Sequence, residues 1–324
     1  MQGRGVPVTR FTNNAQRNWK QSYSPDGQFL SFEDLLYGNA TVRLAEEGRQ
    51  QPLNIGAYVH SEALGGEYTD SFQWHPSETW FAGSVAERGN YNLMLFRLSS
   101  RWFGSDDDPY RIRRSELAGA DGWQGDIRFF PDGQRAVYVT GERGNGDIAL
   151  CAVARCRPQF LTEPDALDFA PDVSDTGQII FTSRRDGTDA LYLVDPETLA
   201  SSRLSDGTTP TSYGVFADTR AVVAYQNSDL VEISLATGTA RVLARQVLLE
   251  QRPAIQPGGP WVAYIANNPD ARPLMIVHRQ TGEVHNLETG LFYHERPVWH
   301  PDGTRIMVQG FDGFQWDLFE VALR

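Results

Sequence analysis

The sequence contains few cysteines and no long apolar run. Only two of its 324 residues are cysteines, and they are not spaced as Cys-x-x-Cys. A zinc ribbon or an iron–sulfur cluster needs more thiolate ligands, so both kinds of site are excluded. No apolar stretch reaches the roughly 18 residues of a membrane-spanning helix. No signal peptide is visible either, an absence that earlier removal of a leader would also explain.

Basic residues are also in deficit. Lys and Arg total 29 against 41 acidic residues, which gives a formal net charge of −12. Nucleic acids and anionic membranes attract basic surfaces, so we expect neither as the main partner. Hydrophobic residues make up 40% of the chain and aromatic residues 11%. This content is sufficient for a buried core and excludes global disorder.

The two cysteines, Cys151 and Cys156, flank a predicted hairpin turn. A disulfide between them would indicate an oxidising compartment. Alternatively, Cys151 packs as a small apolar residue and Cys156 is a free thiol in the turn. The sequence leaves both alternatives open.

Catalytic signatures are sparse as well. The chain has no Gly-x-Ser-x-Gly elbow, no His-Glu-x-x-His motif and no P-loop. Its six histidines are His60, His75, His278, His285, His294 and His300. His75 and His300 occupy the same position of a repeated phrase, which indicates a structural role. Only His60 and His294 fall where a ligand could meet them, so these two are the catalytic candidates.

That phrase recurs seven times. Its clearest copies are Ser22–Phe32, Arg128–Val139 and Val298–Val308, each with a Pro-Asp-Gly core. The Pro-equivalent positions are Pro25, Pro76, Pro131, Asp175, Ala217, Pro257 and Pro301. Because they lie 40 to 55 residues apart, the chain is predicted to be a repeat protein.

Each repeat is predicted to form one blade of a propeller. Pro presets φ and Gly supplies a positive φ, so Pro-Asp-Gly predicts a tight turn, and alternating apolar residues then predict half-buried strands. Four antiparallel strands in about 45 residues form a blade. The last repeat ends after its third strand, and Val6–Thr12 resembles a fourth strand. We therefore expect an all-β, seven-bladed propeller, one domain over residues 1–324, closed by the N-terminal strand.

The first strand of each blade should line the central channel. Counting five residues back from each Pro-equivalent gives the channel-mouth positions. They are Lys20, Ser71, Asp126, Ala170, Ser212, Arg252 and Arg296, with Trp19 and Asp70 beside them. This ring is either a solvated lining with weak ion pairs or a ligand mouth. In the second case, Arg252 and Arg296 would grip a carboxylate.

Insertions and aromatic residues mark the same face. Residues 57–69 and 118–125 lengthen connections that should rise over the mouth, and long loops in a compact scaffold are frequently functional. The aromatic residues expected on this face are Trp19, Trp123, Phe314 and Trp316. They are either platforms for a ligand or packing between blade tops. A third insertion, Ser99–Pro109, is expected to be a solvated acidic loop on the opposite face, rather than a calcium site.

The Pro-Asp-Gly phrase, as in Ser24–Gly27 and His300–Gly303, resembles the TolB-like or WD40-like (PD40) propeller repeats. The resemblance covers nearly the whole chain. It implies bacterial proteins, often periplasmic or extracytoplasmic, that bind proteins, peptides or glycans through the channel face. TolB has an additional N-terminal domain that is missing from this sequence.

A narrower resemblance is to oligogalacturonate lyases, carried by Val8–Thr12, Gln16–Asn18 and the following Ser-Pro-Asp-Gly turn. It implies a manganese ion held by histidines at the channel mouth and abstraction of the proton next to a uronate carboxylate. The matching region here, Tyr293–Pro297, contains a single histidine. A metal-free elimination would use an arginine to neutralise the carboxylate and His or Tyr as base.

Together these observations predict a non-catalytic binding propeller. Its partner would be a protein, peptide or glycan at the channel mouth, with no cofactor and no nucleic acid. The predicted ligand-binding residues are Trp19, Lys20, Asp70, Trp123, Asp126, Arg252, Arg296 and Trp316. The alternative is a polysaccharide lyase acting on uronate oligosaccharides, with a divalent metal at the mouth. We expect a periplasmic or extracellular location, and a cytoplasmic one stays open.

Overall fold

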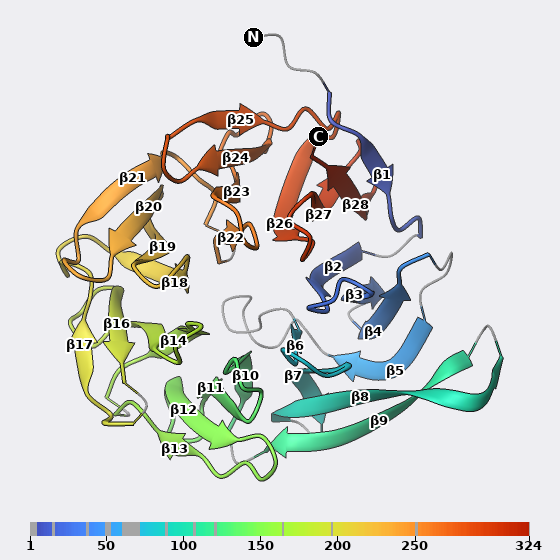
Figure 1. The fold of residues 1–324 in the computed structure, drawn as a ribbon, viewed down its shortest axis with the longest axis horizontal. Coiled ribbons are helices and arrows are strands. Elements are labelled where there is room, and N and C mark those ends of the chain that lie inside the picture. The colour runs from blue at the N-terminus through green and yellow to red at the C-terminus, as the bar shows by residue number, and fades with distance from the viewer. Residues whose placement is uncertain are drawn as a thin grey trace.

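The structure, a computed structural model, is an all-β ring of seven antiparallel sheets (Figure 1). It describes residues 5–14, 17–36, 39–48, 53–59, 72–87, 90–105, 108–119, 122–163, 165–195, 197–249 and 252–323. Each sheet has four strands and forms one blade. The predicted seven-bladed propeller is confirmed. Within the described ranges no helix is long and apolar enough to cross a membrane.

The blades follow one another along the chain. Blade 1 contains β2 (Arg17–Tyr23), β3 (Phe29–Leu36), β4 (Asn39–Glu46) and β5 (Leu53–Val59). Blade 2 contains β6 (Gln73–Trp74), β7 (Trp80–Glu87), β8 (Asn90–Ser105) and β9 (Asp108–Ala118). Blade 3 contains β10 (Gln124–Phe129), β11 (Arg135–Thr140), β12 (Asp147–Ala152) and β13 (Gln159–Phe160). Blade 4 contains β14 (Asp168–Val173), β15 (Ile179–Ser183), β16 (Ala190–Val194) and β17 (Ser201–Arg203).

The remaining blades complete the ring. Blade 5 contains β18 (Thr211–Phe216), β19 (Ala221–Gln226), β20 (Asp229–Ser234) and β21 (Ala240–Ala244). Blade 6 contains β22 (Ala254–Ile255), β23 (Trp261–Ile265), β24 (Leu274–His278) and β25 (Val284–Asn286). Blade 7 contains β26 (Tyr293–Trp299), β27 (Arg305–Phe311), β28 (Trp316–Ala322) and β1 (Val8–Arg10). The first strand of every blade lies innermost (Figure 1).

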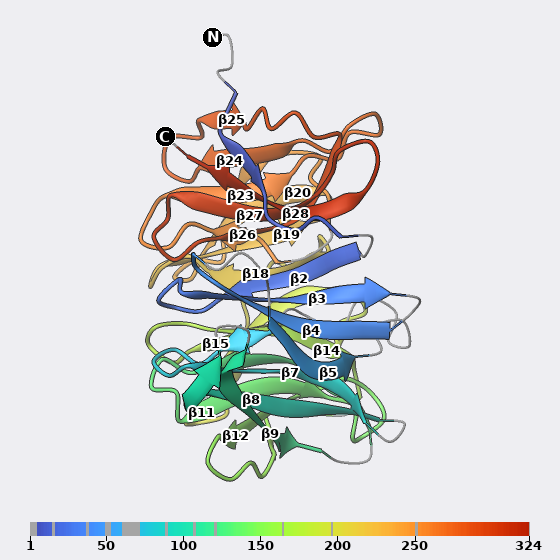
Figure 2. The same ribbon diagram turned by 90° about the vertical axis from the view of Figure 1, so that its right-hand side faces the viewer.

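The N-terminal strand closes the ring, as expected. β1 pairs antiparallel with β28, and the edge-on view shows blade 1 next to blade 7 (Figure 2). A side-chain hydrogen bond repeats the geometry of a normal fourth strand. Thr12 Oγ1 donates to buried Asp317 over 3.0 Å, just as Thr162 Oγ1 donates to buried Asp147 over 3.2 Å in blade 3. The closing strand therefore replaces a fourth strand of blade 7 in its contacts as well as its position.

Buried apolar residues gather between neighbouring blades. Seven clusters occur among the described residues, one at each of the seven interfaces. The interface of blades 3 and 4 has eleven buried members, including Phe181. The interface of blades 7 and 1, called the seam below, has five, including Phe32. Because each buried large apolar side chain contributes about 1.5–3 kcal/mol, the seam depends least on apolar packing.

Bulges bend the inner strands at one recurring position. Ladder register shifts occur in β2, β10, β14, β18 and β26. Within each shift one non-glycine residue has a positive φ of 52° to 56°, and these residues are Lys20, Asp126, Ala170, Tyr213 and Arg296. Such bulges re-aim side chains, here at the channel mouth.

The bulge also corrects the register predicted for blade 5. The Pro-equivalent residue was expected at Ala217 and the channel-mouth residue at Ser212. The amide of Ala217 instead donates to Ala221 O. In the other blades the equivalent bond is made by the residue directly before the Pro-equivalent position. The turn position is therefore Asp218, and the bulge residue is Tyr213. The prediction was wrong by one residue because this turn has neither proline nor glycine and is one residue shorter.

Two further expectations are settled by the structure. The insertion Ser99–Pro109 was expected to be a loop, but most of it continues β8 and β9 as a long hairpin, with Ser105 paired to Asp108. Asp106 and Asp107 lie outside the described residues. Cys151 and Cys156 form a disulfide across the turn after β12, with their Cα atoms 5.0 Å apart.

Candidate functional site

Blades 7 and 1 bring cationic and aromatic side chains together at the channel mouth. The ring of Trp19 lies 5.5 Å from Arg17 Cζ, 5.0 Å from Lys20 Nζ and 5.1 Å from Arg296 Cζ. Arg17 also lies 5.5 Å from the ring of Trp316. We call these five residues the mouth cluster. Among the described residues the buried Nε1 of Trp19 has no hydrogen-bond acceptor.

An aromatic surface extends from the mouth cluster over the top of blade 7. Trp316 lies 5.6 Å from Phe311, and Phe311 lies 6.1 Å from Tyr293. On the adjoining turns, Phe292 is 57% exposed and Phe314 is 93% exposed. Burying such rings in a folded protein's own core is the rule, so two exposed phenylalanines on neighbouring turns indicate a contact surface.

Glu295 anchors one cation of the mouth cluster, Arg17. Its carboxylate lies 2.9 Å from Arg17 and 3.3 Å from Arg272. Lys20, which is almost fully buried, lies 3.5 Å from the buried carboxylate of Glu33. These pairs hold the cations in place around Trp19. The mouth therefore presents a positioned set of cations and rings rather than mobile surface side chains.

Two further ion pairs lie along the channel, one across the ring and one between neighbouring blades. Arg252 of blade 6 lies 3.5 Å from Asp126 of blade 3, and it donates to Ala170 O of blade 4 over 3.3 Å. Arg128 lies 3.6 Å from Asp172. Burial raises the pKa of Asp172, and the charges of Arg252 and Arg128 act in the opposite direction. Each arginine thus counters the cost of burying a carboxylate near the channel axis.

A cavity of about 220 Å³ opens beside these pairs in the central channel, with a wall formed by blades 1, 2, 3, 6 and 7. Its polar wall is formed by Gln21, Ser22, Gln73, Arg128 and Arg252. Its apolar wall is formed by Pro253, Ala254, Ile255, Pro257, Pro297, Val298 and Trp299. We call it the channel cavity. Gln21, which lines this cavity, directly follows Lys20 of the mouth cluster in the chain.

The predicted ligand-binding residues separate into groups. Trp19, Lys20, Arg296 and Trp316 come together in the mouth cluster, whereas Arg252 and Asp126 pair with each other on the other blades of the channel. Arg252 and Arg296 are thus engaged with different partners. Trp123 is partly buried and packs against the apolar cluster of blades 3 and 4. Asp70 lies outside the described residues.

The catalytic candidate His294 is held on both sides of its ring. It is 2% exposed, with Nε2 2.6 Å from Thr289 Oγ1 and Nδ1 2.7 Å from Arg272 O. Burial lowers its pKa, opposed by the bond to the Arg272 carbonyl, so the neutral ring is favoured. These contacts favour a structural role. Its catalytic role stays a prediction, and the other candidate, His60, lies outside the described residues.

The residues present do not form an evident metal site. In the described ranges no three His, Cys, Asp or Glu side chains are grouped to hold a metal ion. The described carboxylates that pair with the mouth cluster are Glu295 and Glu33, and both are already engaged with cations. Cations repel a divalent metal, so the described side chains of the mouth cluster do not fit one.

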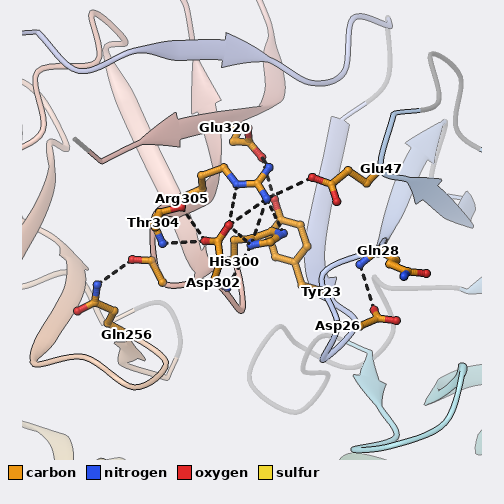
Figure 3. A network of polar contacts seen from close by, with 11 residues as sticks. Tyr23, Asp26, Gln28, Glu47, Gln256, His300, Asp302, Thr304, Arg305 and Glu320 are labelled. Carbon is orange, nitrogen blue, oxygen red and sulfur yellow. Dashed lines mark hydrogen bonds and ion pairs between the residues drawn. The ribbon is translucent and has the colours of Figure 1, made fainter.

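A second polar group, not anticipated from the sequence, lies where the Pro-Asp-Gly turn of blade 7 meets blade 1 (Figure 3). Arg305 lies 3.1 Å from Asp302 and 3.3 Å from both Glu47 and Glu320. Burial and the charge of Glu320 raise the pKa of Tyr23 well above its usual range. We call this group the seam network, and it includes His300. A cavity of about 200 Å³ adjoins it.

The two histidines of the repeat have the structural role predicted for them. His75 Nε2 lies 3.1 Å from Gly133 O, in the turn of the next blade. The ring of His300 lies against Gly27 in the turn of blade 1, so closely that an added Cβ would stand 2.6 Å from it. Gln256 occupies the same position in blade 6 and donates to Gly303 O over 2.7 Å. This position links successive turns around the ring.

No protein-family model matches the chain, and no curated protein sequence matches it. Solved structures do. An oligogalacturonate lyase in complex with manganese has a TM-score of 0.71 at 12% identity, covering 98% of this chain and 93% of the lyase. TolB from Acinetobacter baumannii has a TM-score of 0.56 at 18% identity, covering 91% of this chain and 68% of TolB.

A third similar structure is a puromycin-hydrolysing peptidase from Mycobacterium tuberculosis. Its TM-score is 0.61 at 15% identity, covering 86% of this chain but only 44% of the peptidase. The likeness establishes the fold. At identities this low, one propeller scaffold serves unrelated tasks, so function must be argued from the site.

Proposed function

We propose that this chain is a non-catalytic binding propeller that recognises a protein, peptide or glycan at the channel mouth. The observation that carries the proposal is the mouth cluster, in which Arg17, Lys20 and Arg296 surround Trp19 within 5.5 Å. Trp and Arg are the residue types that dominate binding energy at interfaces.

The exposed aromatic surface of blade 7 supports the same assignment. Phe314 is 93% exposed on the turn between β27 and β28, next to Phe292. Rings of this kind stack on sugars or fill apolar pockets of a protein partner. The contacts of His294 favour binding over catalysis, because a general base needs a ring nitrogen within reach of the substrate.

We also place the protein in an oxidising compartment, periplasmic or extracellular. The Cys151–Cys156 disulfide supports this location, since disulfides persist in such compartments and are rare in the cytosol. A direct check is the oxidation state of the pair in freshly lysed, alkylated cells. A reduced pair in the native protein would contradict the location.

The experiment is a binding screen on peptide and glycan arrays, followed by titration of the ligands found. Phe314→Ser should weaken binding about tenfold or more, because truncating an anchoring ring removes its contact area. Its exposure makes an effect on folding small. Leu249→Ser is the matched control, an exposed apolar residue in the connection between blades 5 and 6. Equal affinity of Phe314→Ser and the native chain would place the site elsewhere.

The same preparation tests the alternative function. Incubation with uronate oligosaccharides should give no increase in the absorbance of unsaturated products. Such an increase, lost in His294→Ala, would replace the binding proposal with polysaccharide lysis.

A further inference from the structure

Two arginine side chains line the channel cavity. Arg128 and Arg252 line it, whereas their carboxylate partners, Asp172 and Asp126, do not, and no other described carboxylate does. The cavity is thus lined by the cations of two ion pairs and not by their carboxylates. In a partly desolvated site this arrangement favours an anionic group.

A buried amide adds a second requirement. Gln21 is fully buried and lines the cavity, and its Nε2 donates to Arg296 O. Its Oε1 accepts no hydrogen bond from the described residues. Buried acceptors are nearly always paired in native proteins. Oε1 has less than 1 Å² of exposed surface, so a donor on a ligand reaches it when the Gln21 side chain turns toward the cavity. The occupant should therefore carry an N–H group as well as an anion.

The opposite wall is apolar. Proline, isoleucine, valine and tryptophan side chains form it, among them Pro253, Ile255, Val298 and Trp299. Trp299 is already satisfied, because its Nε1 donates to Ala254 O over 2.9 Å. This wall offers no further side-chain hydrogen bond, so it fits an aliphatic side chain rather than the hydroxyl groups of a sugar.

We propose that the channel cavity binds the C-terminal residue of a peptide. The free carboxylate faces Arg128 and Arg252, the last peptide N–H donates to Gln21 Oε1, and an aliphatic side chain packs against Pro253 and Val298. A peptide C-terminus carries an anion and an N–H donor on the same residue, whereas a uronate carries the anion alone. This inference rests on the proposed function and names the ligand class.

The test uses two peptides that differ only at the terminus. Acetyl-Gly-Ala-Leu with a free carboxylate and the same peptide as its amide are titrated into the full chain by calorimetry. We expect the free acid to bind about tenfold to a hundredfold more tightly, because a charge-assisted hydrogen bond is lost in the amide. Equal affinities, or no binding of either peptide, would overturn the inference.

A second test adds a negative charge to the cavity wall with a substitution that is expected to leave folding intact. Gln73→Glu keeps the side-chain size at a half-buried position and adds a carboxylate to the wall. This variant should bind the free-acid peptide about tenfold or more weakly than the native chain does, because the two carboxylates repel each other. The matched control is Gln178→Glu, the same substitution at an exposed turn of blade 4. An effect of equal size in both variants would mean that net charge, not the cavity, governs binding.

Two further arms separate the parts of the inference. Gln21→Met removes the Oε1 acceptor at similar side-chain volume. It should weaken binding of the free-acid peptide and keep the melting temperature within a few degrees of the native value.

Glucuronate tests the anion without an N–H donor. If it binds as tightly as the peptide, the site is one for acidic sugars. If a ligand from the arrays is weakened by Phe314→Ser while the peptides never bind, the cavity inference fails and the proposed function stands.

Discussion

The interface of blades 3 and 4 and the seam of blades 7 and 1 occupy equivalent places in the ring, yet different forces hold them. In blade 3 the residue before the Pro-Asp-Gly turn is Phe130, which is 1% exposed and belongs to an apolar cluster of eleven. In blade 7 the same position is His300, in contact with the charged groups of Arg305 and Asp302. The seam replaces part of its apolar packing with charges.

The difference matters for where ligands bind. The mouth cluster lies at one end of the seam, the seam network lies at the other, and the channel cavity borders it. Closely packed apolar interfaces have no room or polar groups for a partner. Among the described residues the seam combines charges, rings and cavities, whereas apolar packing is most extensive at the interface of blades 3 and 4.

The largest test of this comparison removes one buried ring on each side. Phe181→Ala, in the interface of blades 3 and 4, should lower the free energy of unfolding by about 3–5 kcal/mol because it leaves a cavity among packed neighbours. Phe32→Ala, in the seam, should lower the free energy of unfolding by an amount at the lower end of that range, since fewer apolar neighbours surround Phe32. Urea unfolding measures both, and an equal or larger loss for Phe32→Ala would refute the comparison.

A smaller effect is expected from the charges. Arg305→Met should cost about 1–2 kcal/mol, because it leaves the carboxylates of Glu47, Asp302 and Glu320 without their shared cation at a partly exposed site. Arg135→Met is the matched control at the same repeat position in blade 3. Its carboxylate contacts are longer, at 3.7 and 3.9 Å, so it should cost at most about 0.5 kcal/mol. Equal costs by urea unfolding would show that the seam network adds no stability.

The smallest effect is a dependence on pH. Desolvation raises the pKa of Asp302, but hydrogen bonds from Thr304 and the charge of His300 outweigh it and lower the pKa to about 2. The unfolded chain therefore takes up the proton first as the pH falls. The stabilisation is present above the ordinary pKa of 3.8 and is lost between about pH 4 and pH 2.

Asp302→Asn removes this stabilisation, so its unfolding free energy should differ from the native value at pH 6 and approach it near pH 2. Asp132→Asn, at the same turn position in blade 3, is the control. Asp132 accepts a hydrogen bond from the Gln134 amide, but the residue two positions before it is Phe130 and not a histidine. The difference in unfolding free energy between Asp132→Asn and the native chain should therefore change less with pH. A difference for Asp302→Asn that is constant from pH 6 to pH 2 would contradict the assignment.

The fold was predictable because its signals are local. Pro-Asp-Gly turns and alternating apolar residues act within a few positions, so each blade could be read from its own segment. The prediction failed in blade 5, where the turn around Asp218 has neither proline nor glycine, and it shifted the channel-mouth residue from Tyr213 to Ser212. The disulfide stayed open because spacing alone does not distinguish a bonded pair from a buried thiol and a free one.

The candidate site was only partly predictable. Counting from the turns identified Lys20, Asp126, Arg252 and Arg296 as channel residues, since a strand's position in a blade follows from its order in the chain. Their partners did not follow. Arg252 and Asp126 are 126 positions apart in sequence and meet only across the ring. The seam network was missed because Glu47 and Arg305 belong to the first and last blades.

The sequence by itself determined the number of blades, their strands and the closing role of residues 8–10, because turn chemistry and strand periodicity depend on neighbouring residues. The tertiary structure decided which blade faces meet and with what charge. Closure of the ring joins the two ends of the chain at the seam, and there the arginines, carboxylates and rings of distant segments are brought within contact distance. Long-range contacts of this kind have no local signature, which is why only the folded ring reveals the site.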